Sequence, residues 1–144
     1  MRLPMSRPAL AALACAALLA FAAPATAASV NLKAELKASN EVPPNDSKGA
    51  GSVTATYDEA SKTLSWKGTV TELTAPATAA HFHNGDPGKN GAVVVPIAGA
   101  DKGAFEGSAV LTEQQAADVL AGRWYVNVHT AANKGGEVRG QLTK

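Results

Sequence analysis

Alternation of apolar and polar residues is the main pattern along this chain. In SVNLKAELKA (29–38) every second residue is apolar, which is the period of a strand with one buried face. The same alternation recurs in GSVTATY (51–57) and TLSWKGTV (63–70), and the residues between them form a hairpin-like connection. Further strands are predicted at 78–84, 92–97, 104–110, 123–130 and 136–142.

One short helix interrupts the series of strands. Thr112 and Gln115 have the spacing of a capping box, and Gly122 can end the helix. The apolar residues between them share one face: Ala116, Val119 and Leu120. Seven or more short strands and one short helix predict a single all-β domain, an antiparallel Greek-key β-sandwich or barrel.

The first 27 residues have the pattern of an export signal. Arg2 and Arg7 form a basic region, an apolar run follows over 8–23, and Ala-Thr-Ala at 25–27 is a cleavage sequence. This predicts a signal peptide at 1–27, a domain at 28–144, and a periplasmic or secreted protein. The apolar run is too short to span a membrane, and a lipid anchor on Cys15 is the alternative interpretation.

Charge and composition narrow the partners of the predicted domain. The formal net charge of the whole chain is +1, and loss of Arg2 and Arg7 makes it −1 (+1 − 2). Such a nearly neutral domain has no electrostatic footprint for nucleic acid or anionic lipid. The one cysteine is Cys15, and both methionines also precede residue 28. The domain therefore has neither a disulfide nor a soft sulfur ligand.

The three histidines are concentrated in two of the predicted strands. His81 and His83 are two residues apart in AHFHNG, and His129 follows in YVNVHT. Residues i and i+2 of a strand point the same way with Cα atoms about 6.6 Å apart, so His81 and His83 project side by side, opposite Phe82. Alternation in 123–130 also places His129 on the face away from the core. If the two strands are neighbours, all three imidazoles can bind one ion; otherwise they are merely exposed.

Three neutral imidazoles suit zinc or copper as ligands. Copper is the predicted metal because it binds such sites more tightly in the divalent series. Zinc would accept the same three ligands.

Side chains on the face of the histidines are the predicted surroundings of the ion. Tyr125 and Asn127 share a face with the later histidine, and Glu137 and Arg139 take the corresponding face of 136–142. A carboxylate or amide beside a ligating imidazole fixes its tautomer. Arg139 would attract a small anion. Glu137 and Arg139 can equally pair with each other or with a cross-strand charge.

Two segments resemble a known family. AHFHNGDPGKNGAVVVPI (80–97) and GRWYVNVHTAANKGGEVRGQL (122–142) resemble the signature elements of the CHRD (chordin) domain family, and the likeness covers nearly all of 28–144. The family occurs in chordin, an extracellular antagonist of secreted growth factors, and in stand-alone secreted or periplasmic bacterial proteins. The resemblance implies a β-sandwich and an extracytoplasmic location, and says little about activity.

A weaker likeness is to copper-zinc superoxide dismutases, which place an H-x-H pair on one strand of a Greek-key β-sandwich. His81 and His83 look like that pair, the segment from Gly122 to His129 looks like the one carrying a later copper histidine, and Arg139 stands where an arginine guides superoxide. The chain departs from that pattern because it has no bridging histidine, no zinc-site cluster and no cysteine pair.

These patterns lead to two functional hypotheses for a secreted or periplasmic CHRD domain. In the first, copper held by His81, His83 and His129 alternates between Cu(II) and Cu(I), and Arg139 draws in superoxide. In the second, the domain is not catalytic and either stores or delivers copper or binds another extracellular protein.

Overall fold

The computed structural model describes residues 28–144, so the predicted signal peptide at 1–27 lies outside the described residues. Eight strands form the domain: β1 (Ser29–Lys37), β2 (Ala50–Asp58), β3 (Thr63–Thr71), β4 (Ala77–Asn84), β5 (Ala92–Pro96), β6 (Ala104–Val110), β7 (Trp124–Thr130) and β8 (Val138–Gln141). One α-helix, α1 (Glu113–Leu120), and two 3-10 turns, η1 (Ala38–Asn40) and η2 (Ala100–Lys102), complete it. No helix among these residues is long and apolar enough to cross a membrane.

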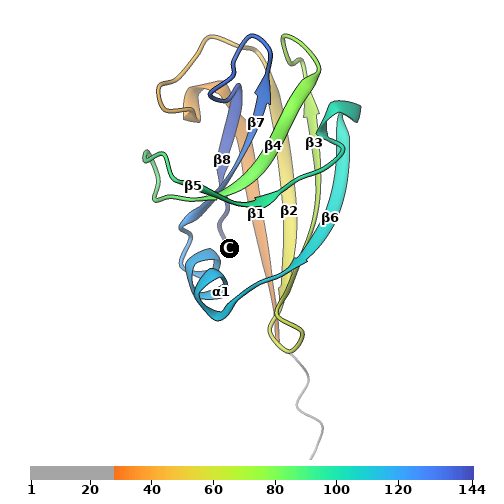
Figure 1. Ribbon diagram of the computed structural model, residues 1–144, viewed down its shortest axis with the longest axis vertical. Coiled ribbons are helices and arrows are strands. Elements are labelled where there is room, and N and C mark those ends of the chain that lie inside the picture. The colour runs from red at the N-terminus through yellow and green to blue at the C-terminus, as the bar shows by residue number, and fades with distance from the viewer. Residues whose placement is uncertain (1–27) are drawn as a thin grey trace, which may run out of the picture.

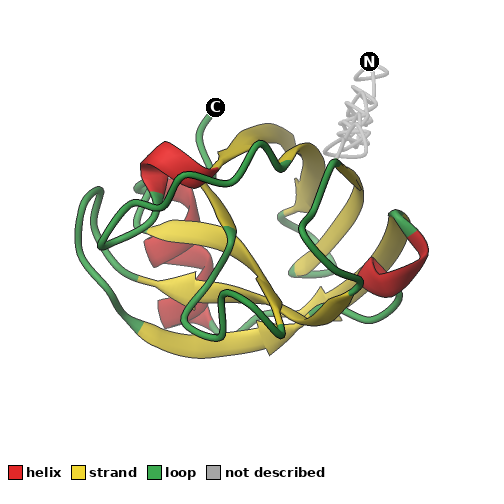
Figure 2. Ribbon diagram, turned by 90° about the horizontal axis from the view of Figure 1, so that it is seen from above, coloured by secondary structure: helices red, strands yellow, loops and turns green. Residues whose placement is uncertain are grey.

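The strands form one antiparallel sheet in the order β5-β4-β7-β8-β1-β2-β3-β6. The sheet curls into a nearly closed barrel around the core (Figure 1 and, from above, Figure 2). Hairpins join β1 to β2, β2 to β3, β4 to β5 and β7 to β8, and longer connections make β4 a neighbour of β7 and β6 a neighbour of β3. The predicted fold class is confirmed.

Alternating burial along the strands produces the core. In β1, Leu32, Ala34 and Leu36 are buried and the residues between them are exposed, as the period of two requires. Aromatic rings fill the centre: Phe82 packs edge-on against Trp66 with ring centroids 5.0 Å apart. The two tryptophans, Trp66 and Trp124, are buried as well.

The helix α1 begins and ends where the sequence predicts. The Thr112 side chain accepts a hydrogen bond from the Gln115 backbone N–H, and the Gln115 side chain accepts one from the Thr112 backbone N–H. This reciprocal pair satisfies two donors that a helix start leaves free. Gly122 has a φ of +75°, a left-handed conformation that glycine adopts without steric cost.

Strand β7 is buried on both faces. Its Trp124, Val126 and Val128 face the core, while Tyr125 and Asn127 face outward and are nevertheless covered. The cover comes from two loops. The β1–β2 connection places Glu41 against Asn127, and the β4–β5 connection places Asn90 and the Lys89 carbonyl against Arg139 of β8. This covered outer face holds the candidate site.

Candidate metal centre

Strands β4 and β7 bring the three histidines together. In the antiparallel register, His81 lies opposite Asn127, His83 opposite Tyr125, and His129 opposite Ala79. Because side chains alternate along each strand, all three imidazoles project from the same face, away from the buried Phe82. The predicted face is confirmed, and the two strands are neighbours, which was the condition for a shared site.

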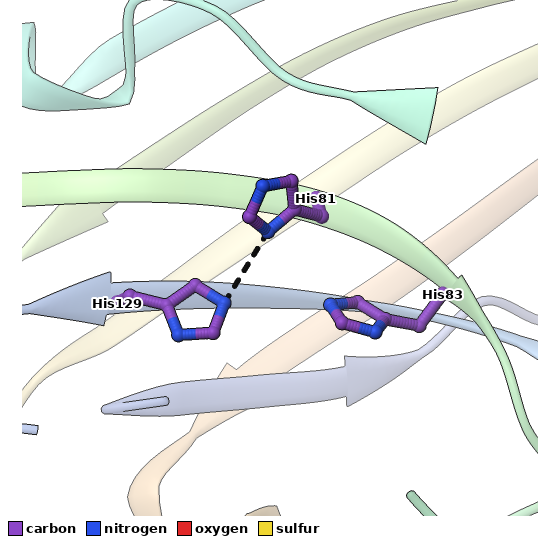
Figure 3. A group of neighbouring side chains, drawn as sticks. All are labelled: His81, His83 and His129. Carbon is purple, nitrogen blue, oxygen red and sulfur yellow. Dashed lines mark hydrogen bonds between the residues drawn. The ribbon is translucent and has the colours of Figure 1, made fainter. Parts of the chain in front are cut away.

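The ring nitrogens lie close enough to share an ion after small movements. His81 Nδ1 is 3.3 Å from His129 Nε2, and one nitrogen from each of the three rings can be chosen so that no two are more than 4.8 Å apart (Figure 3). Two nitrogens about 2.0–2.1 Å from a tetrahedral ion lie about 3.3 Å apart. The His81–His129 spacing already matches this value. The widest spacing, 4.8 Å, would have to close by about 1.5 Å for all three rings to bind one ion.

Backbone carbonyls set the tautomers of two rings. His83 Nδ1 lies 3.0 Å from the Gly91 carbonyl oxygen, and His129 Nδ1 lies 2.8 Å from the Lys134 carbonyl oxygen. A carbonyl only accepts, so each Nδ1 carries the hydrogen and each Nε2 of the neutral ring keeps its lone pair. Metal-ligating histidines are commonly held in this way through their other ring nitrogen. The sequence predicted a carboxylate or amide in this role, and two carbonyls perform it.

Burial favours the neutral form of these imidazoles. It lowers the pKa of His81, and the nearby rings of His129 and His83 lower it further. Burial also lowers the pKa of His83, against a smaller opposite effect of the hydrogen bond between its Nδ1 and the Gly91 carbonyl. The neutral imidazole is the form that binds a metal.

One nitrogen of the cluster is buried without a partner. His83 is 8% exposed, and its Nε2 has no hydrogen-bond partner. A buried acceptor left unpaired costs about 1–3 kcal/mol, and a cation bound between the rings would satisfy it. The residues present therefore fit a metal ion.

An aromatic column supports His83. The Tyr125 ring stacks on the His83 ring with centroids 4.7 Å apart and planes 8° apart, and the Arg139 guanidinium lies 3.4 Å from the centre of the Tyr125 ring. Since β7 lies between β4 and β8, Tyr125 separates His83 from Arg139. Arg139 as a whole is 2% exposed, and its guanidinium donates to Asn90 Oδ1 and the Lys89 carbonyl. It therefore faces the β4–β5 loop rather than solvent.

Asn127 and Glu41 form a buried polar pair beside the rings. The Asn127 amide nitrogen donates to both Glu41 carboxylate oxygens, at 3.0 and 3.3 Å, and lies 3.4 Å from the Gly135 carbonyl. Burial raises the pKa of Glu41 to about 7, although the Asn127 hydrogen bond and the Arg139 charge lower it. At pH 7 the Glu41 carboxyl group beside the cluster is therefore about half protonated.

Glu137 is placed away from the predicted role. Its carboxylate is fully buried and accepts hydrogen bonds from four residues, none of them a histidine: Ser47, Thr74, Thr130 and Asn133. Burial acts to raise the pKa of Glu137, but the hydrogen bonds from Ser47, Thr130 and Thr74 outweigh it and lower the pKa to about 2. Glu137 therefore joins loops and strands as a buried anion, and it forms no ion pair with Arg139.

The cluster opens to solvent on one side. His81 and His129 line a shallow hollow of about 480 Å³, together with Ala131, Lys134 and neighbouring residues. Two hollows on the outer β2–β3–β6 face, about 760 and 440 Å³, have no histidine in their lining. A small molecule can thus approach His81 and His129 directly, while His83 lies on the buried side.

Three groups beside the rings were not predicted from the sequence: the Glu41 side chain and the backbone carbonyls of Gly91 and Lys134. Glu41 lies in a polar, proline-containing loop, and no periodicity marks its side chain as buried. The carbonyls of Gly91 and Lys134 carry no side-chain signal at all. The only hint was the turn chemistry of both loops, which predicts tight chain reversals close to the ends of the histidine strands.

Comparison with known proteins identifies one family. The sequence model of the CHRD domain matches residues 32–142, which include every strand from β2 to β8 and most of β1. Neither the curated proteins nor the solved structures yielded a match to this chain.

Proposed function

The chain belongs to the CHRD domain family, and from its histidine cluster we propose that it binds a copper ion through His81, His83 and His129. The observation that carries the proposal is the convergence of the rings, with His81 and His129 nitrogens 3.3 Å apart and the buried His83 Nε2 unpartnered. Carbonyl acceptors hold two of the rings in the tautomer that a metal requires.

Copper is preferred over zinc for a chemical reason. An all-imidazole set binds both ions, and copper is the stronger partner in the divalent series. When bound, copper would supply one-electron redox chemistry at the half-buried cluster. Zinc would be inert to reduction, so the metal decides whether the site can be catalytic.

Access to the cluster supports superoxide as a candidate reactant. The hollow that exposes His81 and His129 admits a small molecule, and Lys134 lines it. The role of Arg139 in attracting superoxide stays a prediction. Arg139 is buried and stacks on Tyr125, which stacks on His83. This arrangement favours an indirect effect of Arg139 on the His83 ring over direct contact with an anion.

Copper retention is the first test of the proposal. The purified domain is loaded with Cu(II), passed through a desalting column, and its copper content is measured. We expect one copper per chain in the wild type and none in the triple His→Ala variant. Glu106→Gln, at an exposed residue outside the cluster, is the matched control and should keep the copper. A wild type that retains no more copper than the triple variant would end the proposal.

Superoxide consumption by the loaded protein then separates the two functions. Turnover that requires the three histidines supports a dismutase-like enzyme. Copper bound without turnover supports storage or delivery of the ion.

Export through a signal peptide at 1–27 belongs to the same proposal. The mass of the protein recovered from the periplasm or medium tests it, and a chain beginning at Ala28 is expected.

A further inference from the structure

A second unpartnered atom lies beside the unpartnered nitrogen of His83. Among the described residues, four buried side-chain polar atoms have no hydrogen-bond partner: Trp66 Nε1, His83 Nε2, Trp124 Nε1 and Asn127 Oδ1. The two indole nitrogens are donors in the apolar core. The other two are acceptors, and both belong to the covered face of the β4–β7 pair. Leaving either acceptor unpaired lowers the stability of the fold by about 1–3 kcal/mol.

The orientation of the Asn127 amide is fixed from its opposite end. Its nitrogen has three acceptors, the two Glu41 oxygens and the Gly135 carbonyl. A flipped amide would place an oxygen against these acceptors, so the oxygen must point the other way. Asn127 is 3% exposed, which keeps bulk water from satisfying that oxygen.

The strand register places this oxygen among the rings. Asn127 lies directly opposite His81 and two residues before His129 on the same face of β7. His83 in turn lies opposite Tyr125, two residues before Asn127 on the same face. The register therefore places Asn127 among the three histidines on this covered face, where two buried acceptors, Asn127 Oδ1 and His83 Nε2, lack a partner. A cation is what such a pair of acceptors accommodates.

We propose that the amide oxygen of Asn127 is a fourth ligand of the metal, completing a set of three nitrogens and one oxygen. This inference rests on the proposed function. An amide oxygen is a hard ligand that suits divalent ions, whereas Cu(I) prefers soft ligands. Asn127 thereby favours Cu(II) and Zn(II) over Cu(I), and it lowers the reduction potential of bound copper.

Affinity measurements in both oxidation states test the inference. Cu(II), Zn(II) and Cu(I) affinities are measured by chelator competition for the wild type, Asn127→Leu and Glu106→Gln. Asn127→Leu should weaken Cu(II) and Zn(II) binding by about ten- to a hundred-fold, the range for residues that support a metal site, with Cu(I) binding changed by less than about threefold and the reduction potential raised. Glu106→Gln, at an exposed residue outside the cluster, is the matched control and should retain wild-type affinities.

A second measurement needs no substitution and covers the case in which Asn127→Leu does not fold. The side-chain carbonyl carbon of Asn127 is followed by NMR in the wild type as Zn(II) is added. Coordination predicts a large shift of this carbon that saturates with one equivalent, larger than at any other asparagine side chain.

Three outcomes are distinguishable. Loss of divalent affinity alone, with the carbonyl shift, supports the inference. Wild-type copper binding with no carbonyl shift, or with equal effects of Asn127→Leu on Cu(I) and Cu(II), overturns the inference and leaves the three-histidine site standing. A wild type that binds no metal overturns both.

Discussion

Replacing Glu137 by glutamine should remove a large part of the stability of the domain. The pKa of this carboxylate is about 2 in the fold, against an ordinary value of 4.5. Its hydrogen bonds therefore stabilise the ionised form by about 3 kcal/mol relative to the unfolded chain. For a domain whose whole stability is about 5–15 kcal/mol, this is a major fraction.

The geometry shows why glutamine is a poorer partner. One carboxylate oxygen accepts from the Thr74 backbone N–H, a donor that cannot be reversed, so a glutamine must turn its amide oxygen to Thr74. Its NH₂ group then replaces the oxygen that accepts from the Thr74 hydroxyl, the Thr130 hydroxyl and the Asn133 amide. These three groups must turn round to accept, and every partner loses a charged acceptor. We expect Glu137→Gln to lower the free energy of unfolding by about 3 kcal/mol at pH 7.

The dependence on pH gives a second signature. The folded pKa is depressed, so the stabilisation is complete above pH 4.5 and is lost as the pH falls toward 2. Urea unfolding of the metal-free protein, followed by the fluorescence of Trp66 and Trp124, measures this at several pH values. The wild-type curve should fall more steeply between pH 4.5 and 2 than that of the variant.

A control and a contrary result complete the experiment. Glu106, an exposed carboxylate 3.7 Å from Lys67, should change the unfolding free energy by less than about 1 kcal/mol when replaced by glutamine. If Glu137→Gln behaves like this control at pH 7, or if it keeps the wild-type acid dependence, the hydrogen-bonded anion is not what stabilises these loops.

Three further substitutions have defined outcomes in the metal-free protein. The pKa of Glu41 is raised to about 7, so its contribution to the free energy of unfolding is greatest below pH 4.5 and falls as the pH rises to 7. Glu41→Gln should remove this fall. At pH 8 we expect the variant to be more stable than the wild type by up to about 3 kcal/mol in urea unfolding. Arg139→Met leaves the Lys89 carbonyl without its donor and should lower stability by about 1–3 kcal/mol; an unchanged unfolding midpoint would contradict this. In Gly136→Ala, a new Cβ at a φ of +131° would overlap the Asn127 amide and the Glu41 carboxyl, so we expect the free energy of unfolding to fall by at least about 2 kcal/mol. Gly135→Ala is the control, because nothing lies near the added carbon there. Equal melting temperatures of the two variants would refute the overlap.

The period of two predicted much of this structure because it depends only on neighbouring residues. It placed Phe82 in the core and His81 and His83 on the opposite face, and all three placements are confirmed. The capping box at Thr112 was equally local and equally correct. Strand boundaries agree with the structure to within about two residues, the uncertainty usual for such assignments.

The interior of the candidate site could not be predicted in the same way. The 3.3 Å approach of His81 to His129 depends on the register between β4 and β7, which long connections and barrel closure determine. Parity correctly placed Glu137 off the core face, but only the β1–β2 loop and Thr74 decide that it serves as a buried anion away from the rings. The burial of Arg139 likewise depends on how the β4–β5 loop folds over β8.

The histidine cluster joins two strands that are distant in sequence: His83 of β4 and His129 of β7 are 46 positions apart (129 − 83). An ion held between them would staple β4 to β7, and at this separation a permanent cross-link contributes about 4 kcal/mol in the chain-entropy model. The described residues contain no cysteine, so coordination would take the place that a disulfide holds in many exported domains. Unlike a disulfide, this cross-link would be reversible, because a chelator would remove the ion from between β4 and β7. The supply of metal would then determine how well the domain resists heat and proteases.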